Sequence, residues 1–455
     1  MKSTTIAAIS TAQGESGIGV IRVSGDEAIE ICDRVFKAVS GKKLSEMKGY
    51  SAAFGHIYKE NEAIDECVAT VFRNPKSYTG EDVVELSCHG GIYITRDTLR
   101  AVLEQGASPA QAGEFTKRAF LNGKLDLTEA EAVIDIISAK SKNAARAALY
   151  AKDGALWKRT EAIKNKLVTT AAHLSAWVDY PEEDIEEVTE ESLRRVFSES
   201  IEELDRLLKT YDAGQTVKEG IDTVIAGKPN TGKSTLMNLL AGHDRSIVTD
   251  IPGTTRDIIE ETVLVGGIML RLSDTAGIRD TGDAVEKIGV ELAKNRLENC
   301  GLVLAVFDDS KPLDENDLSL LEKLDAENTI AIINKTDLES KLDSSPIENK
   351  LNDVIRISAK NGDGYTELEK AVARLAGTEN FNPSEGILAN ERQRTAVINA
   401  KQSLQNALDA LNMGLTFDAA EVDLENAIES VCELTGERVS EVVVGNVFHN
   451  FCVGK

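Results

Sequence analysis

The 455-residue sequence lacks long hydrophobic runs and paired cysteines. No apolar run approaches the ~20 residues that a membrane-spanning helix needs, so we expect no membrane segment. The six cysteines are scattered, without C-x-x-C spacing or a disulfide framework, which is typical of free thiols in a reducing compartment. The first residues show neither the apolar core of a signal peptide nor the Arg-rich pattern of a transit peptide. We therefore expect a cytoplasmic location.

The sequence also lacks positive charge. It has 51 Lys and Arg residues against 76 Asp and Glu residues, which gives a formal net charge of −25. This balance argues against indiscriminate binding to nucleic acids or anionic membranes, although it does not exclude a local basic patch for one folded RNA. The length allows about three domains, and the composition is that of an ordinary soluble globular protein.

A phosphate-binding loop is the most informative motif that is present. The pattern G-x-x-x-x-G-K-[ST] is matched from Gly227 to Ser234, between a strand-like run over 221–226 and a helix-like run over 235–240. Backbone N–H groups of such a loop close around phosphate oxygens, Lys233 would reach the β- and γ-phosphates, and the Ser234 hydroxyl would bind Mg²⁺. The expected nucleotide contacts of this loop are Asn230, Thr231, Gly232, Lys233, Ser234 and Thr235.

Further nucleotide-binding motifs follow at domain-length spacing. Asp337, after the apolar strand 330–333, can accept both N–H groups of guanine, a pair that adenine does not offer. Thr255 offers a hydroxyl for Mg²⁺. The pattern resembles a GTPase of the Era and translation-factor-like class. The additional contacts expected for GTP are Thr249, Asp250, Ile251, Pro252, Gly253, Thr254, Thr255, Asp274, Thr275, Ala276, Gly277, Asn334, Lys335, Asp337, Ser358, Ala359 and Lys360.

The catalytic glutamine of Ras-like GTPases is absent. Its position, after Gly277, is taken by Ile278, which cannot orient a water molecule. One candidate for the missing chemistry is a monovalent cation, held by Asn230 and by carbonyls of the segment 249–255, which would act like an arginine finger. The other is Glu286, which could position the water; on local sequence alone, a solvated carboxylate at a helix start is the favoured interpretation.

The order of patterns along the chain predicts three domains. Residues 1–120 are expected to be α+β, with strands over 4–9, 18–23, 68–72 and 82–88, helices over 26–39 and 92–105, and a tight turn at Gly14, Gly17 and Gly19. Residues 217–378 alternate strand and helix, which is typical of a parallel sheet. Residues 121–214 and 380–455 are helical with apolar stripes, so we expect one discontinuous helical domain into which the GTPase domain is inserted. A separate C-terminal helical hairpin is the alternative.

Long motifs near both ends of the chain narrow the family. The N-terminal domain carries Gly17-Ile18-Gly19-Val20-Ile21-Arg22-Val23-Ser24-Gly25, then a Ser77–Glu85 segment, His89-Gly90-Gly91 and a Gly113–Leu127 segment. The sequence continues with Asn390-Glu391-Arg392 and reaches Phe451-Cys452-Val453-Gly454-Lys455. Over essentially its whole length the chain resembles the MnmE (TrmE) family of tRNA uridine-modification GTPases.

The resemblance implies more than the spacing does. Members of this family are homodimeric, potassium-dependent GTPases that work with the flavoprotein MnmG (GidA), in a heterotetramer-type complex, on C5 of the wobble uridine of certain tRNAs. They add an aminomethyl or carboxymethylaminomethyl group and bind 5-formyltetrahydrofolate or a related one-carbon folate in an N-terminal tetrahydrofolate-binding-like domain. By the same match, the folate contacts would be Arg22, Glu85, Lys124 and Lys455. The potassium ligands would be Asn230, Thr249, Ile251 and Thr254. The magnesium ligands would be Ser234 and Thr255.

The resemblance also assigns the catalytic role to Glu286, as general base or water-orienting group. Cys452 is a candidate for one-carbon or redox chemistry, although a buried, inert thiol is slightly favoured. The chain departs from the family pattern at Thr11 to Gly17, where paired prolines and an Arg are usual, at Gln393 in place of His, and at His449-Asn450 in place of Ser-Arg. The last two changes concern the surface that would face tRNA or a partner.

Two other classes of protein remain as alternatives. A ribosome-assembly GTPase of the Era kind would need an RNA-binding module such as a KH domain, and no such basic segment is found. A septin-like or dynamin-like assembly protein would have no use for the folate-type motifs of the N-terminal domain.

Overall fold

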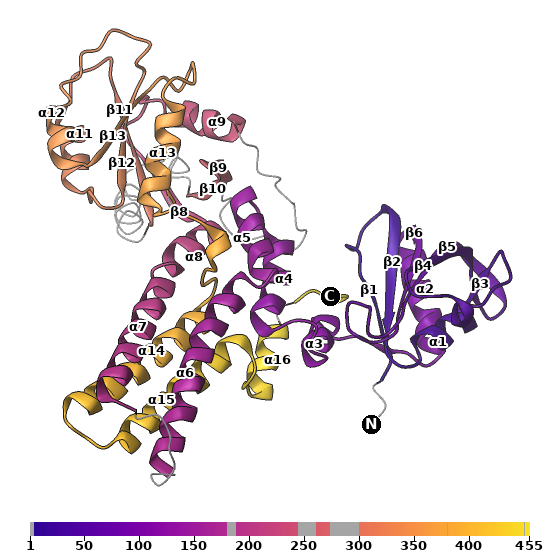
Figure 1. The fold of residues 1–455 in the computed structure, drawn as a ribbon. Helices are drawn as coiled ribbons and strands as arrows, with labels where there is room; N and C mark the ends of the chain where they lie inside the picture. Colours follow the sequence, from indigo (N-terminus) through magenta and orange to yellow (C-terminus); the bar gives the residue numbers. More distant parts are fainter. Residues whose placement is uncertain (1–3, 180–187, 244–260, 274–299, 380, 450) are drawn as a thin grey trace, which may run out of the picture. The chain divides into compact units, whose positions relative to one another are not determined.

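A computed structural model describes residues 4–179, 188–243, 261–273, 300–379, 381–449 and 451–455. The chain forms two compact units, one of residues 1–134 with 428–455 and one of residues 135–427. Figure 1 shows the course of the chain. Within the described ranges, no helix is long and apolar enough to cross a membrane.

The first unit is built on a seven-stranded sheet. Its order is β3-β4-β5-β6-β2-β1-β7, antiparallel throughout except for the parallel pair β1 and β7. The strands are β1 (Ile6–Ile9), β2 (Ser16–Ser24), β3 (Phe36–Ala38), β4 (Ser51–Lys59), β5 (Glu62–Phe72), β6 (Val83–Gly90) and β7 (Ser108–Pro109). The helical elements beside it are α1 (Ala28–Val35), η1 (Leu44–Glu46), α2 (Ile92–Glu104) and α3 (Glu114–Leu121).

One face of this sheet is buried by α1 and α2. Alternate residues of β2 and β6, such as Ile21, Val23 and Leu86, are fully buried in one cluster with apolar residues of both helices, because the period of two along a strand matches the apolar stripe of each helix. The opposite face therefore presents the intervening residues, among them Arg22 and Glu85, which stand directly opposite each other in the register of β2 and β6.

The sequence-based elements of this unit need three corrections. Gly17 and Gly19 lie inside β2 rather than in a turn; a Cβ on Gly19 would come within 2.2 Å of the Thr95 methyl, so the glycine is required by close packing. The helix expected over 26–39 ends at Val35 and is followed by β3. Strand β4 was not predicted, because only part of its alternating pattern is apolar.

The C-terminal segment of the chain belongs to the first unit. Helix α16 (Glu441–His449) packs Val444 and Phe448 against Leu127 and Phe120, in a cluster that includes the start of α4 (Leu127–Ser138). We had expected the chain to be helical to residue 455. Instead, helix α16 is followed by a non-helical segment, in which Val453 forms a β-bridge with Ala112. This bridge leads the last residues to β1 and β2.

The second unit contains helices from both sides of the GTPase domain. These are α5 (Lys142–Lys152), α6 (Ala155–Asp179), α7 (Glu190–Leu208), α8 (Tyr211–Glu219), η2 (Pro383–Glu385) and α14 (Glu391–Asn412), while α15 (Phe417–Thr435) runs from this unit into the first. Tyr211 donates a hydrogen bond to Glu391 at 2.9 Å, and Arg194 donates to the Leu411 carbonyl at 2.9 Å. Helices that precede and follow the GTPase domain therefore form one discontinuous body, as predicted.

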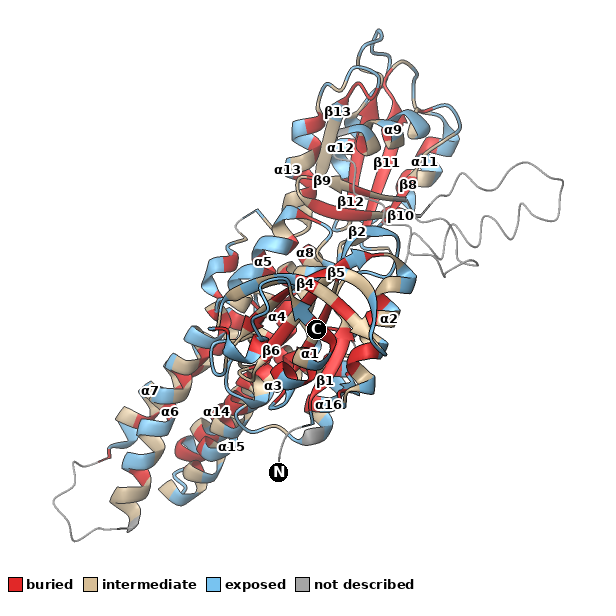
Figure 2. Cartoon of the chain, turned by 90° about the vertical axis from the view of Figure 1, so that its right-hand side faces the viewer, coloured by how far each residue is buried: buried red, intermediate tan, exposed pale blue. Residues whose placement is uncertain are grey.

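The GTPase domain is a six-stranded sheet covered by helices. Its order is β13-β12-β11-β8-β10-β9, and only the pair β9 and β10 is antiparallel. The strands are β8 (Ile221–Ala226), β9 (Glu261–Val265), β10 (Ile268–Ser273), β11 (Leu302–Asp308), β12 (Thr329–Asn334) and β13 (Asp353–Ile357). The helices are α9 (Lys233–His243), α11 (Glu315–Glu322), α12 (Ser345–Lys350) and α13 (Tyr365–Leu375). Figure 2 shows the central strands as buried, in keeping with their continuous apolar sequences.

Candidate functional site

The phosphate loop lies where the central strand β8 turns into α9. Strand β8 lies between β10 on one side and β11 on the other. The loop therefore lies at a topological switch point, at the carboxyl ends of parallel strands. Two glycines are required there by geometry. A Cβ on Gly227 would lie 2.5 Å from the Val306 carbonyl oxygen, and one on Gly232 would lie 2.3 Å from Asn334 Nδ2; both glycines have positive φ.

Lys233 is held against its own loop. Its Nζ donates to the carbonyl oxygens of Gly227 at 2.6 Å and Lys228 at 2.7 Å. Burial lowers the pKa of this ammonium group, and within the described part of the chain no carboxylate pairs with it. A phosphate group at the mouth of the loop would supply the missing negative charge. Ser234 and Thr235, at the start of α9, are exposed.

Asn334 connects the phosphate loop to the loop after β13. The residue is buried, its Nδ2 donates to the Thr231 carbonyl at 2.9 Å, and its Oδ1 accepts from the Ala359 N–H at 3.0 Å. One amide side chain thus joins the loop that would surround the phosphates to the loop that would contact the base. From the sequence, Asn334 was predicted only as a member of a nucleotide-binding motif. Its role as a connector is visible in the structure.

The expected guanine-binding groups lie together. Asp337 is exposed, and its Oδ1 accepts a hydrogen bond from the Ser358 hydroxyl at 2.8 Å. That bond holds one oxygen of the carboxylate in place. Ala359 is buried and Lys360 is exposed beside it. The arrangement can accept the two N–H groups of a guanine edge, as the sequence predicts.

Two ionic contacts at this site were missed in the sequence. Lys335, at a positive φ of 70°, donates to the Asn230 carbonyl at 2.7 Å and to Asp308 at 2.6 Å. Hydrogen bonds from Lys335 and Ser310 lower the pKa of Asp308 against the opposing effect of burial. Asp308 could have been found, because it is the carboxylate that ends the apolar strand β11.

The second missed contact involves the phosphate loop itself. Lys228 Nζ lies 2.7 Å from Asp314 and 2.6 Å from Asp317, the two residues of the capping box of α11. No sequence signal indicated this pairing, because the residues are 86 or more positions apart. The contact ties the outer side of the loop to a rigid helix start.

Part of the predicted nucleotide site lies outside the described residues. This applies to Glu286, to Ile278 and to the following expected contacts: Thr249, Asp250, Ile251, Pro252, Gly253, Thr254, Thr255, Asp274, Thr275, Ala276 and Gly277. Of the predicted potassium ligands only Asn230 is described; it has a φ of 65°, which a non-glycine residue rarely adopts. Of the predicted magnesium ligands only Ser234 is described.

A second cluster of predicted site residues lies on the open face of the first unit's sheet. Arg22 pairs with Glu85 at 2.9 Å and also donates to the Gly454 carbonyl at 3.2 Å. Its guanidinium lies 5.4 Å from the Tyr78 ring centroid and 5.6 Å from that of Phe115. The structure therefore brings together residues from β2, β6 and the last turn of the chain.

The other two predicted folate contacts differ in position. Burial and, to a smaller extent, the Arg22 charge lower the pKa of Lys455, and the Glu85 charge opposes this shift. Lys124 instead donates to the Pro75 carbonyl at 3.1 Å and forms no hydrogen bond with Arg22, Glu85 or Lys455, all of which are described residues. Cys452 is exposed, which contradicts the favoured interpretation of a buried thiol.

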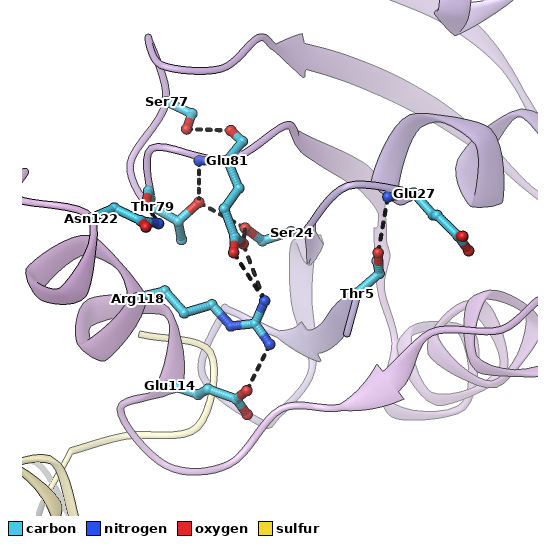
Figure 3. Close-up of polar contacts among 9 residues, drawn as sticks. All are labelled: Thr5, Ser24, Glu27, Ser77, Thr79, Glu81, Glu114, Arg118 and Asn122. Atoms are coloured by element: carbon cyan, nitrogen blue, oxygen red, sulfur yellow. Dashed lines mark hydrogen bonds and ion pairs between the residues drawn. The ribbon is translucent and has the colours of Figure 1, made fainter. Parts of the chain in front are cut away.

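Two motifs of the N-terminal domain meet in a polar network next to this cluster (Figure 3). Arg118 of α3 donates to Glu81 at 3.1 and 3.2 Å and to Glu114 at 2.9 Å, and Glu81 accepts from Ser24 at 2.8 Å. Asn122 donates to the Thr79 carbonyl at 2.8 Å. The network fixes the loop before β6, and hence the position of Glu85, against α3.

Comparison with known proteins identifies the family. A model described as the GTP-binding protein TrmE N-terminus matches residues 5–124, and one described as the MnmE helical domain matches residues 127–452. A protein of Clostridioides difficile (strain 630), named tRNA modification GTPase MnmE, is 43% identical over 99% of both chains. The chain belongs to the MnmE family. A relative of the same name from Alkaliphilus oremlandii (strain OhILAs) is 42% identical, again over 99% of both chains.

Solved structures with similarity to the chain cover less of it. The G domain of the T. maritima FeoB iron transporter is 25% identical and covers 34% of this chain and 98% of its own, with a TM-score of 0.26. An Aquifex aeolicus Era variant bound to GDP and AlF4⁻ is 25% identical and covers 40% of this chain and 66% of its own, with a TM-score of 0.27. Membership of the MnmE family rests on the two family models and the full-length relatives.

Proposed function

We propose that this member of the MnmE family is a GTP hydrolase that acts in tRNA modification. The observation that carries the proposal is the linked arrangement of the phosphate loop, Asn334 and the Asp337–Ser358 pair, in a chain that aligns end to end with proteins named tRNA modification GTPase. Lys233 and the loop N–H groups would hold the phosphates, and Asp337 would select guanine. Ser234 and Thr255 would hold Mg²⁺, which would supply neutralisation of phosphate charge.

The hydrolysis step that we propose depends on K⁺ and on Glu286. Ile278 occupies the position where Ras-like proteins use Gln, so another group must organise the water and the charge. K⁺, bound by Asn230, Thr249, Ile251 and Thr254, would stabilise the transition state, and Glu286 would orient the water. The left-handed backbone at Asn230 supports a special role for this residue.

The test is GTP turnover at fixed ionic strength in KCl and in NaCl. We expect a large acceleration specific to K⁺ that is lost in Asn230→Ala, and turnover that falls in Glu286→Ala without a matching loss of GTP binding. Equal rates in both salts would remove the cation from the mechanism, and a fully active Glu286→Ala variant would remove the carboxylate.

The N-terminal site is proposed to bind a one-carbon tetrahydrofolate such as 5-formyltetrahydrofolate. Glu85 can accept a pair of N–H groups from a pterin ring, while Arg22, Lys124 and Lys455 can pair with carboxylates or ring oxygens. Burial and the Arg22 charge both lower the pKa of Lys455, so a bound anion would stabilise the charged form of this lysine. Isothermal titration with the folate tests the site: Arg22→Ala is expected to abolish measurable binding, and normal binding by that variant would contradict it. Cys452 remains a candidate for the one-carbon chemistry.

The full activity that we propose requires a homodimer, tRNA and the flavoprotein MnmG (GidA), which modify C5 of the wobble uridine in the cytoplasm. We place the domain limits at 1–120, 121–214 with 380–455, and 217–378. Mass spectrometry is the direct assay, on nucleosides from tRNA incubated with this protein, MnmG, GTP, the folate, an amine donor (ammonium for the aminomethyl group, glycine for the carboxymethylaminomethyl group) and a reductant for the flavin. An aminomethyl or carboxymethylaminomethyl uridine is expected, and unmodified uridine in the complete reaction would contradict the function.

A further inference from the structure

One strongly basic part of the chain belongs to neither site. Residues 140–166 contain eight Lys or Arg residues and only two acidic ones, in a protein whose formal net charge is −25. The basic residues of this stretch are spread over two helices, α5 and α6, so they do not form a compact basic motif in the sequence. Its first part forms what we call the α5 basic face, defined as Lys140, Lys142, Arg146, Leu149 and Tyr150.

The α5 basic face is the outer side of an amphipathic helix. Ala144, Ala147 and Ala148 are buried, and Ala144 and Ala147 belong to a cluster with Val217 and Ile387, which fixes the inner side of α5. Lys142, Arg146 and Tyr150 follow one another at i, i+4 and i+8, so they share the opposite side. Ser141 caps the helix by accepting from the Ala144 N–H at 3.1 Å, so the first turn that carries Lys142 is well defined.

The positive charges of this face are not neutralised within the described part of the chain. Lys140, Lys142 and Arg146 are exposed, and none forms an ion pair with another described residue. By contrast, Lys164 and Lys166, farther along on α6, lie against Glu161 and Glu199 respectively.

The acidic groups nearest in sequence do not change this. Asp135 is held by Lys218 at 2.8 Å, and Asp153 lies 3.9 Å from Lys152. Lys142 and Arg146 therefore lie on one side of a rigid helix without an ion-pair partner among the described residues, and Lys140 precedes this helix by two residues.

Exposed apolar groups accompany these cations. The exposed fraction is 51% for Leu149 and 36% for Tyr150, on the same side as Arg146. Aromatic rings beside cations are typical of surfaces that bind RNA, because the cations contact phosphates while the ring stacks on an unpaired base. An acidic protein partner would be served by the charges alone and would gain less from an exposed tyrosine.

We propose that the α5 basic face binds the backbone of tRNA, with Lys140, Lys142 and Arg146 on phosphates and Tyr150 stacked on an unpaired base. The proposal rests on the proposed function, which makes tRNA the substrate. It also explains how so acidic a protein holds RNA: most of its surface repels the polyanion, so one basic face selects the orientation in which the tRNA docks.

Binding of fluorescently labelled tRNA to the full-length chain tests the proposal. The variant Lys140→Ala/Lys142→Ala/Arg146→Ala is compared with Lys323→Ala/Lys350→Ala/Lys370→Ala, which removes three exposed lysines of the GTPase domain and leaves the same net charge. At about 0.1 M salt we expect at least a tenfold loss of affinity in the first variant and less than a twofold change in the second. The slope of log K against log salt is expected to fall by about two to three in magnitude, since each phosphate contact contributes ~0.7–0.9.

Tyr150→Ala separates stacking from charge. It is expected to weaken binding about fivefold or more while leaving the salt slope unchanged. All three variants are expected to hydrolyse GTP within twofold of the parent, because none touches the nucleotide site.

Three outcomes would overturn the proposal: no tRNA binding by the parent, parental affinity in the first variant, or an equal loss in the control variant. If the first variant binds tRNA normally but no longer binds MnmG, the face serves a protein partner instead. Failure of the proposed function is a separate result, seen as unmodified uridine in the complete reaction of the parent.

Discussion

Asn334→Ala is the most direct perturbation of the nucleotide site. The substitution removes the donor to the Thr231 carbonyl and the acceptor of the Ala359 N–H, and both of these backbone groups lie in a buried setting. An unsatisfied buried group costs about 1–3 kcal/mol, so the two together cost about 2–6 kcal/mol. When this cost falls on the ordered, nucleotide-bound state, it corresponds to a loss of GDP affinity of about 30-fold to about 10⁴-fold.

Fluorescence titration with a labelled GDP measures the effect. Asn361→Ala is the matched control, because Asn361 is an exposed residue of the neighbouring turn, and we expect it to bind GDP as the parent does. Asp337 is retained in both variants, so neither should gain affinity for ATP. A folded Asn334→Ala variant that bound GDP within threefold of the parent would show that the two loops keep their arrangement without this side chain, and the reasoning would be wrong.

Two further predictions concern other parts of the chain. Gly232→Ala is expected to weaken GDP binding at least tenfold, because the new Cβ would overlap Asn334 Nδ2 at a positive φ; Gly242→Ala, where nothing lies within 4 Å, is the control and should bind normally. The pKa of His89 is expected to lie above its ordinary value of 6.5, because its ring Nδ1–H donates a hydrogen bond at 2.7 Å to the Asp65 carboxylate. The protonated ring thus contributes stability that is complete below pH 6.5 and is lost as the pH rises through the raised pKa. NMR titration of the ring in the parent and in Asp65→Asn checks this, and an unchanged midpoint in the variant would disprove the assignment.

Much of the nucleotide site could be predicted because its residues are consecutive. The loop 227–234 and the elements on either side of it obey local rules of turn, strand and helix formation, and the structure places β8 and β12 within one residue of their predicted limits. The discontinuous helical body could also be predicted from the sequence, because the apolar stripe of a helix such as α15 must be buried against another helix.

Contacts between distant residues could not be predicted. The Lys228–Asp314 and Lys335–Asp308 pairs depend on how far apart two loops lie after the sheet has formed, and no local pattern encodes that distance. The turn predicted at Gly17 and Gly19 was wrong for a related reason. Glycine is typical of turns, but at Gly19 it is needed because the Thr95 side chain packs against the strand backbone.

The bond between Arg22 and the Gly454 carbonyl spans 432 positions of the sequence. A ribosome adds roughly 5–20 residues each second, so roughly 20–90 s separate the appearance of β2 from that of its last neighbour. During this interval the strands of the first sheet are already present, and the Glu85 partner of Arg22 has been made, but Gly454 and Lys455 have not. The N-terminal site is therefore completed only after Gly454 and Lys455 have been made, and a nascent or truncated chain without residues 452–455 would carry a folded GTPase domain together with an unfinished N-terminal site.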